Sequence, residues 1–181
     1  MPSHSPDNRA MDSDRIFFVT IVTAQRRPIF RREATATLLI ETLSHYRDER
    51  KFLLHEFVIM PDHIHVLLSP APQISLERAM QFIKGGFSFR LKFRGPVWQA
   101  SFSNHRIRDL EDYEHHRENI RMNPVRARLA ERPEEYPYSS GGKRDATRSR
   151  PTGAETTFFG GNRNAALKGR SSTILSQFFK A

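Results

Sequence analysis

The sequence predicts an α+β fold: a ferredoxin-like, split βαβ antiparallel sheet with helices on one face and an added helix near its C-terminal end. Three observations predict it. Short stretches rich in β-branched and aromatic residues alternate with stretches of helical periodicity. A tight turn joins two of the strand-like stretches into a hairpin. A further short strand and a polar helix follow, which completes the order strand, helix, strand, strand, helix, strand, helix.

The first half of the chain contains three strands and one helix. Residues 16–23, IFFVTIVT, have the composition of a strand. Residues 33–48 carry apolar side chains at helical spacing and predict an amphipathic helix. Residues 52–60 and 63–69 are strand-like, and the pair Pro61-Asp62 between them predicts the turn of a hairpin.

A second helix is expected from Ser75 to about Phe93. Ser75 is a suitable N-cap. Glu77 falls in the first turn, where a negative charge interacts favourably with the helix dipole. The pair Gly85-Gly86 lies inside this pattern and weakens it, because glycine is a poor helix former.

The last elements are a short strand at residues 105–108 and a helix at residues 110–122. Asp109 can cap this helix. Pro124 should end it, because the residue before a proline avoids the helical conformation.

Length and composition indicate one domain and a tail. The 181 residues include 38% hydrophobic residues and 14 phenylalanines, which can supply a core. We expect a disordered N-terminus at 1–14, a folded domain at 15–138 and a basic, largely disordered tail at 139–181. The absence of cysteine excludes disulfides and thiolate metal sites. No secretion signal is evident and no apolar run is long enough for a bilayer, so a cytoplasmic protein without membrane contact is expected.

The net charge of +9 is concentrated near the C-terminus. Residues 139–181 contain eight Lys and Arg and two Asp and Glu, so they carry +6 of the total. A basic excess favours polyanionic partners such as nucleic acids. A solvated basic tail without a partner is the alternative for this segment.

The second strand of the hairpin contains a candidate metal pair, His63 and His65. Alternating side chains place both on one face of the strand, about 6.6 Å apart at the backbone, where they can converge on one ion. Ordinary polar surface residues remain the alternative. Leu67 excludes two other histidine motifs, the metallo-β-lactamase type, which needs an aspartate there, and the histidine-triad type, which needs a histidine.

The last helix carries a polar stripe of His115, Asn119 and Asn123 at spacing i, i+4 and i+8. Arginines add positive charge beside it. A solvated helix face is the alternative interpretation.

Residues 84–98 are basic and aromatic, which suits a surface that follows a nucleic-acid backbone and stacks on bases. Of Phe87, Phe89 and Phe93, two are expected to be buried. The DNA-binding candidates are Lys84, Arg90, Lys92, Arg94, Arg106, Arg108, Arg117, Arg121 and Arg126.

Several segments together resemble one family. The strings FVIMPDHIHVLLSP, QFIKGGFSFRLK, VWQASFSNHRIRDLEDYEHH and NIRMNPVRARL occur in the order and spacing of the REP-associated tyrosine transposases of bacteria. These proteins are relatives of the single-tyrosine HUH transposases of insertion sequences. The resemblance covers residues 15–139.

The resemblance implies a domain that cuts and rejoins single-stranded DNA near hairpins. It implies that His63 and His65 bind a divalent ion, Mg²⁺ or Mn²⁺, and that Asn123 completes the site. A tyrosine four residues before that asparagine attacks the phosphate in the family. The expected partner is single-stranded or hairpin DNA, bound by a monomer or dimer at the bacterial nucleoid.

This sequence departs from the family at the nucleophile, because the corresponding residue is Asn119. Tyr113 is a weak substitute, since ideal helix geometry puts it about 120° around the helix and about 9 Å along its axis. His115 could assist a nucleophile on the same stripe. Three functions therefore remain open: a transposase-family protein with impaired cleavage, a non-catalytic DNA- or RNA-hairpin binding module, and a metal-dependent phosphodiesterase that uses water.

Overall fold

The computed structural model describes residues 15–142. Its elements are β1 (Phe17–Val22), α1 (Glu33–Asp48), β2 (Phe52–Met60), β3 (His63–Pro70), α2 (Leu76–Leu91), β4 (Ser103–Arg106) and α3 (Leu110–Arg126), with short 3-10 turns at Ala24–Arg26, Ile29–Arg31 and Pro133–Glu135. The expected fold class is confirmed. Within the described residues, no helix has the length and apolar character needed to cross a membrane.

The four strands form one antiparallel sheet in the order β2-β3-β1-β4. β1 therefore lies between β3 and β4. In the β1–β3 register, Thr20 faces His65 and Val22 faces His63. Directly paired residues share a face of an antiparallel sheet, so this register places these four side chains on the same side.

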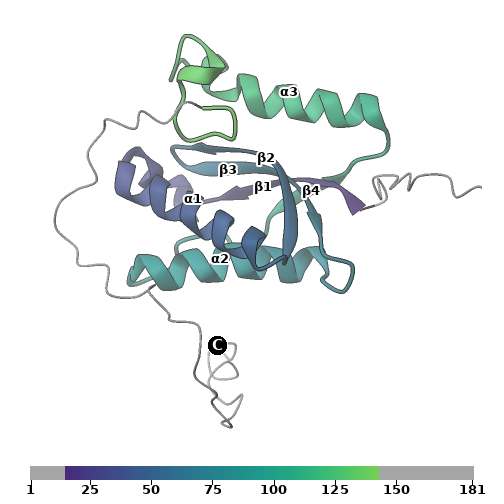
Figure 1. The fold of residues 1–181 in the computed structure, drawn as a ribbon. Helices are drawn as coiled ribbons and strands as arrows, with labels where there is room; N and C mark the ends of the chain where they lie inside the picture. The colour runs from purple at the N-terminus through teal and green to yellow at the C-terminus, as the bar shows by residue number, and fades with distance from the viewer. Residues whose placement is uncertain (1–14, 143–181) are drawn as a thin grey trace, which may run out of the picture. The chain divides into compact units, whose positions relative to one another are not determined.

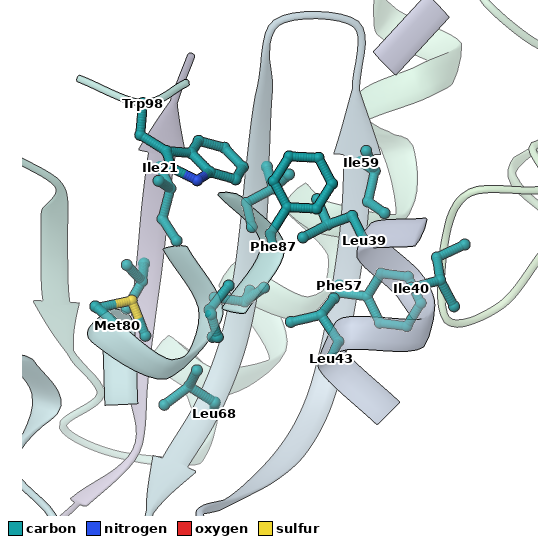
Figure 2. Packing of buried hydrophobic residues seen from close by; sticks show 14 of the residues in the cluster. Ile21, Leu39, Ile40, Leu43, Phe57, Ile59, Leu68, Met80, Phe87 and Trp98 are labelled. Carbon is teal, nitrogen blue, oxygen red and sulfur yellow. The ribbon is translucent and has the colours of Figure 1, made fainter. Parts of the chain in front are cut away.

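The main core lies between the sheet and helices α1 and α2, which both cover one face (Figure 1). In Figure 2, strand residues such as Ile21 and Leu68 lie in the same cluster as Leu39 of α1 and Phe87 of α2. Ile64, Val66 and Leu68 all belong to this cluster, which confirms that the apolar side of the HIHVLL strand faces these helices.

Helix α3 lies over the opposite face of the sheet (Figure 1). The sequence indicated helices on one face of the sheet only and did not predict that the added helix covers the other. A second apolar cluster forms there, in which Ile120 of α3 packs with Val58, Met60 and Leu67 of the sheet and with Tyr136. The apolar residues on this side of the strands are numerous enough to need a cover, and α3 provides it.

The chain after α3 returns to the free edge of β2. Ser139 forms an antiparallel bridge with Val58, and the backbone N–H of Ser140 donates to the carbonyl of Phe57. The folded part thus runs slightly past the expected boundary at 138. The expected disordered N-terminus and the basic tail from 143 onward lie outside the described residues.

Helix α2 begins at the expected cap and passes through both glycines. The Ser75 hydroxyl accepts from the N–H of Arg78 at 3.1 Å. A Cβ added to Gly86 would lie 2.5 Å from the ring of Tyr46 on α1, whereas one on Gly85 would meet nothing within 4 Å. A larger residue at position 86 would therefore have to displace the ring of Tyr46.

Helix α3 begins as expected but ends later. The carboxylate of Asp109 accepts from the N–H of Asp112 at 2.8 Å, which confirms the N-cap. The helix continues through Pro124 to Arg126, and the N–H of Ala127 still reaches the carbonyl of Asn123. Pro124 removes a single donor close to the C-terminal end, which costs less than an interruption in mid-helix.

Candidate functional site

His63 and His65 lie side by side on the face covered by α3. Their ring centroids are 4.8 Å apart, and the rings meet edge to face. Strand β3 creates this proximity, because residues two apart project to the same side. The structure thus brings together the two histidines that the sequence singled out.

Each ring is fixed by a polar contact at its Nδ1. Nδ1 of His63 lies 2.6 Å from Oδ1 of Asp62, and Nδ1 of His65 lies 2.8 Å from Oγ1 of Thr20. Such contacts orient metal-binding histidines and leave Nε2 to coordinate the ion. The pair is therefore arranged as a cation site would require.

The electrostatics favour a neutral imidazole at His65. Burial, with the neighbouring His63, lowers the pKa of His65 to about 4, so its ring is neutral near pH 7. Burial tends to raise the pKa of Asp62, but its contacts with His63 and Arg26 outweigh this and keep it below the usual range. Metal binding needs deprotonated ligands, and this arrangement supplies one at His65.

A stack of rings holds α3 against the same strands. The ring of Phe18 lies 5.2 Å from that of His65 and 4.4 Å from that of His116, stacked on both. His116 is in the middle of α3, and Asn119 and Asn123 follow it one and two turns later. The helix with the polar stripe is thereby held over the histidine pair's face.

The sequence profile of the family described as "Transposase IS200 like" matches residues 14–107. This segment is half of the chain and contains both histidines of the pair. The chain belongs to this family. The match ends before α3, so it does not test the assignments of Asn119 and Asn123.

Individual relatives agree with the family. The REP-associated tyrosine transposase of Escherichia coli is 27% identical over 115 residues, which covers 61% of this chain and 69% of that protein. A relative in Haemophilus influenzae is 27% identical over 146 residues, or 69% of this chain and 78% of that protein. A solved structure described as a REP-associated tyrosine transposase bound to a REP hairpin has a TM-score of 0.64 at 24% identity, covering 90% of this chain and all of that one. The resemblance stated from the sequence is confirmed.

Asn119 and Asn123 are both half-buried on the flank of α3 beside its buried residues. Oδ1 of Asn119 accepts from Nη1 of Arg126 at 2.8 Å. The side-chain amide of Asn123 makes no hydrogen bond within residues 15–142, so its oxygen can still act as a ligand. Its role as the third ligand stays a prediction, as does that of the exposed His115 in assisting a nucleophile.

All four tyrosines of the chain lie within residues 15–142, and none of them is placed to act as a nucleophile in the position of Asn119. Tyr113 packs edge-on against His55, with ring centroids 5.9 Å apart. Along β2, His55 is about 10 Å from Val58, which pairs with His65, and about 16 Å from Met60, which pairs with His63. Tyr113 therefore packs toward the end of β2 that is distant from His63.

The other tyrosines serve the fold. Tyr136 is buried and donates to the carbonyl of Ile59, and burial raises its pKa to about 12. Tyr46 packs against Phe82 of α2, and the half-buried Tyr138 packs against both apolar clusters.

The basic candidates fall on two sides of the sheet. Lys84 and Arg90 lie on α2, where Lys84 donates to the carbonyls of Gln99 and Ala100 and Arg90 pairs with Glu41 at 2.8 Å. These contacts give both residues a structural role. Lys92, Arg94, Arg106 and Arg108 are exposed at the ends of α2 and β4. The remaining candidates, Arg117, Arg121 and Arg126, are exposed on α3, the helix that covers the histidine face.

The expectation that two of the three phenylalanines are buried was wrong. Phe87 is fully buried, but Phe89 is 84% exposed and Phe93 is 49% exposed. Helix α2 has only one face on the core, and residue 89 lies about 200° around the helix from residue 87. The guanidinium of Arg27 lies 4.9 Å from the centre of the Phe93 ring.

Sequence reasoning missed the residues that orient the histidines. Asp62 was interpreted only as a turn residue, although its place directly before the HIH strand is a usable signal. Thr20 could not be found without the strand register. Arg26, which pairs with Asp62 at 3.2 Å, comes from a loop with two consecutive left-handed residues, Gln25 and Arg26.

Proposed function

We propose that this protein binds hairpin-bearing single-stranded DNA through the α3 side of its sheet, and that His63, His65 and Asn123 hold a divalent cation there. The orientation of both histidine rings by Asp62 and Thr20 carries this proposal. Membership of the transposase family supports it.

The proposed ligand set has a clear chemistry. Two imidazole nitrogens and one amide oxygen leave positions for a phosphate oxygen and water, and imidazole suits Mn²⁺ better than Mg²⁺. The bound cation would polarise the scissile phosphate and offset its charge. Asp62 and Thr20 orient the two imidazole rings that would hold the ion, and burial keeps the ring of His65 neutral.

The covalent step of the family is expected to be lost or strongly impaired. An amide such as that of Asn119 does not attack a phosphodiester, whereas a phenol can form the intermediate that stores the bond energy for rejoining. Tyr113 and Tyr136 are held elsewhere. The protein is thus proposed to bind its DNA with little or no adduct formation.

The nucleic-acid partner follows from charge and family. Arg117 pairs with Glu56 and Glu114, whereas Arg121 and Arg126 are exposed on the helix that covers the histidine face and can neutralise phosphates. The solved relative is described as bound to a REP hairpin, which supports a hairpin as the DNA structure recognised here. A DNA-bound protein of this kind would act at the nucleoid of the bacterial cytoplasm, as a monomer or dimer.

The test is incubation of the full chain with a hairpin-bearing single-stranded oligonucleotide and Mn²⁺, followed on native and denaturing gels. We expect a shifted complex on the native gel and no covalent product on the denaturing gel. His63→Ala should weaken Mn²⁺ binding, whereas His45→Ala, on α1 at the opposite face, should not. Failure to bind hairpin DNA would contradict the proposal, and a nick without an adduct would indicate that water is the nucleophile.

A further inference from the structure

A second cluster of metal-binding side chains lies where β4 meets α3. His105 comes from β4, and Asp112 and His116 are one turn apart on α3. Nε2 of His105 lies 2.8 Å from Oδ2 of Asp112, and Nε2 of His116 lies 3.4 Å from Oδ1. One ligand atom from each residue lies within 4.8 Å of the other two, and no other such group of His, Asp or Glu occurs in residues 15–142.

The spacing of these atoms is close to that around a bound transition metal. Zinc binds imidazole nitrogen and carboxylate oxygen at about 2.0–2.1 Å in tetrahedral geometry, which separates neighbouring ligand atoms by about 3.3 Å. The contact between Nε2 of His116 and Oδ1 of Asp112 is near this value, whereas Nε2 of His105 contacts the other carboxylate oxygen, so binding would need a rotation of the His105 ring or of the carboxylate.

The cluster is partly enclosed and incompletely satisfied. The side chain of Asp112 is 9% exposed and that of His116 is 15% exposed. Nδ1 of His116 is buried without a hydrogen-bond partner, and the ring's other nitrogen makes only the long contact to Asp112. A metal bond at Nε2 would be stronger than the contact that this nitrogen makes now.

Asp112 supplies the anionic ligand of the cluster, and its two carboxylate oxygens make different contacts. Arg108 donates to Oδ2 of Asp112 through its backbone N–H and its Nε, which leaves Oδ1 to bind the metal.

We propose that His105, Asp112 and His116 form a second cation site, for a transition metal of the Zn²⁺ type, separate from the histidine pair of β3. Two imidazoles and one carboxylate with an open fourth position are a usual ligand set for such ions. The ring of Phe18, stacked on His65 and on His116, lies between the two sites.

A metal at this site would join β4 to the first half of α3. The same helix carries Asn119 and Asn123 about one and two turns beyond His116. The ion would therefore fix the helix relative to the sheet and restrict how far the proposed active-site residues can move. This role does not depend on DNA binding or on the proposed function of the β3 pair.

The experiment measures Zn²⁺ and Co²⁺ binding to the full chain, freed of metal and without DNA, by calorimetry and by visible absorption of the Co²⁺ form. The His63→Ala/His65→Ala double variant removes the first site. We expect this variant to retain one equivalent of Zn²⁺ per chain and a Co²⁺ absorption band. Adding His105→Ala should weaken this binding at least tenfold, and adding His45→Ala should leave it unchanged.

His105 is the preferred substitution because its side chain is 39% exposed and its truncation should leave the fold intact. His116→Ala in the same background provides a second test, with the Tm of the metal-free variants as the control for folding. The proposal is overturned if the His63→Ala/His65→Ala variant binds no Zn²⁺ or Co²⁺. It is equally overturned if His105→Ala and His116→Ala both leave the affinity unchanged.

Discussion

Nη1 of Arg126 lies 2.8 Å from Oδ1 of Asn119, across the last two turns of α3. The side chain that we propose to occupy the position of the family's nucleophile is thus held toward the C-terminal end of its own helix. The contact is exposed, so it contributes little to stability. The amide end of the half-buried Asn119 therefore reaches the surface of α3, and a larger side chain at position 119 could extend there.

Replacing Asp62 by alanine should weaken Mn²⁺ binding by roughly 10- to 100-fold, the usual effect of removing a group that orients a metal-binding histidine. The cause is the loss of the 2.6 Å contact that fixes the ring of His63. Calorimetry measures the change. Asp48→Ala, at an exposed aspartate on α1, is the matched control, and equal losses in both variants would refute the role of Asp62.

The free energy of unfolding should decrease as the pH falls from about 6.5 to about 4 because of His65. Its pKa is about 4 in the folded protein and about 6.5 when unfolded, so in this window the unfolded chain binds more protons. The expected loss is on the order of 2–3 kcal/mol. Urea unfolding at about pH 7 and about pH 4.5, in metal-free buffer, measures it.

The matched variants for this pH effect are His65→Gln and His45→Gln. His65→Gln should remove that part of the pH dependence, while His55 and His116, whose pKa values are also lowered, keep theirs. A pH dependence that is the same in His65→Gln as in the wild type would contradict the assignment.

The two neighbouring glycines of α2 should respond differently to alanine. Gly85→Ala should stabilise the protein by up to about 1 kcal/mol, because alanine is the better helix former and the added Cβ meets nothing within 4 Å. Gly86→Ala has to displace the ring of Tyr46 and should be the less stable of the two variants by at least about 1 kcal/mol. Thermal unfolding compares them directly, and equal Tm values would show that Tyr46 moves without cost.

The affinity for single-stranded DNA should fall steeply with salt, by roughly 0.7 log units per log unit of salt for each neutralised phosphate. Residues 143–181 carry a net charge of +6, so a chain ending at Gly142 should show a flatter slope. This truncation keeps Ser139 and Ser140, which pair with β2. An unchanged slope would show that the tail makes no phosphate contacts.

The sequence predicted the elements of the fold well, because their signals are local. The helix at 33–48 and the hairpin strands could be predicted from periodicity and from turn residues within a few positions of each other. The alternation of the HIHVLL strand likewise predicted that His63 and His65 share a face. The extension of α3 past Pro124 was missed, since a proline near a helix end costs too little to stop the helix.

The remaining parts of the site depend on contacts between distant segments. The neighbour of His65 is Thr20, and only the β1–β3 register makes them adjacent. His105 and His116 meet because β4 lies at the edge of the sheet beneath α3. Helix α3 covers the histidine face because it packs on apolar residues from several elements. No single segment of the sequence shows that pattern.

We propose that the site keeps His63, His65 and Asn123 as metal-binding residues but lacks its nucleophile. Asn119→Tyr places a phenol on the stripe that contains Asn123, with His115 one turn away to help remove its proton. With hairpin-bearing single-stranded DNA and Mn²⁺, denaturing gels should show little or no covalent adduct for the wild type and a strong adduct for Asn119→Tyr, abolished by adding His63→Ala. A robust wild-type adduct that Tyr113→Phe removes would contradict the claim, and so would an Asn119→Tyr variant that folds, binds the DNA and Mn²⁺, and forms no adduct.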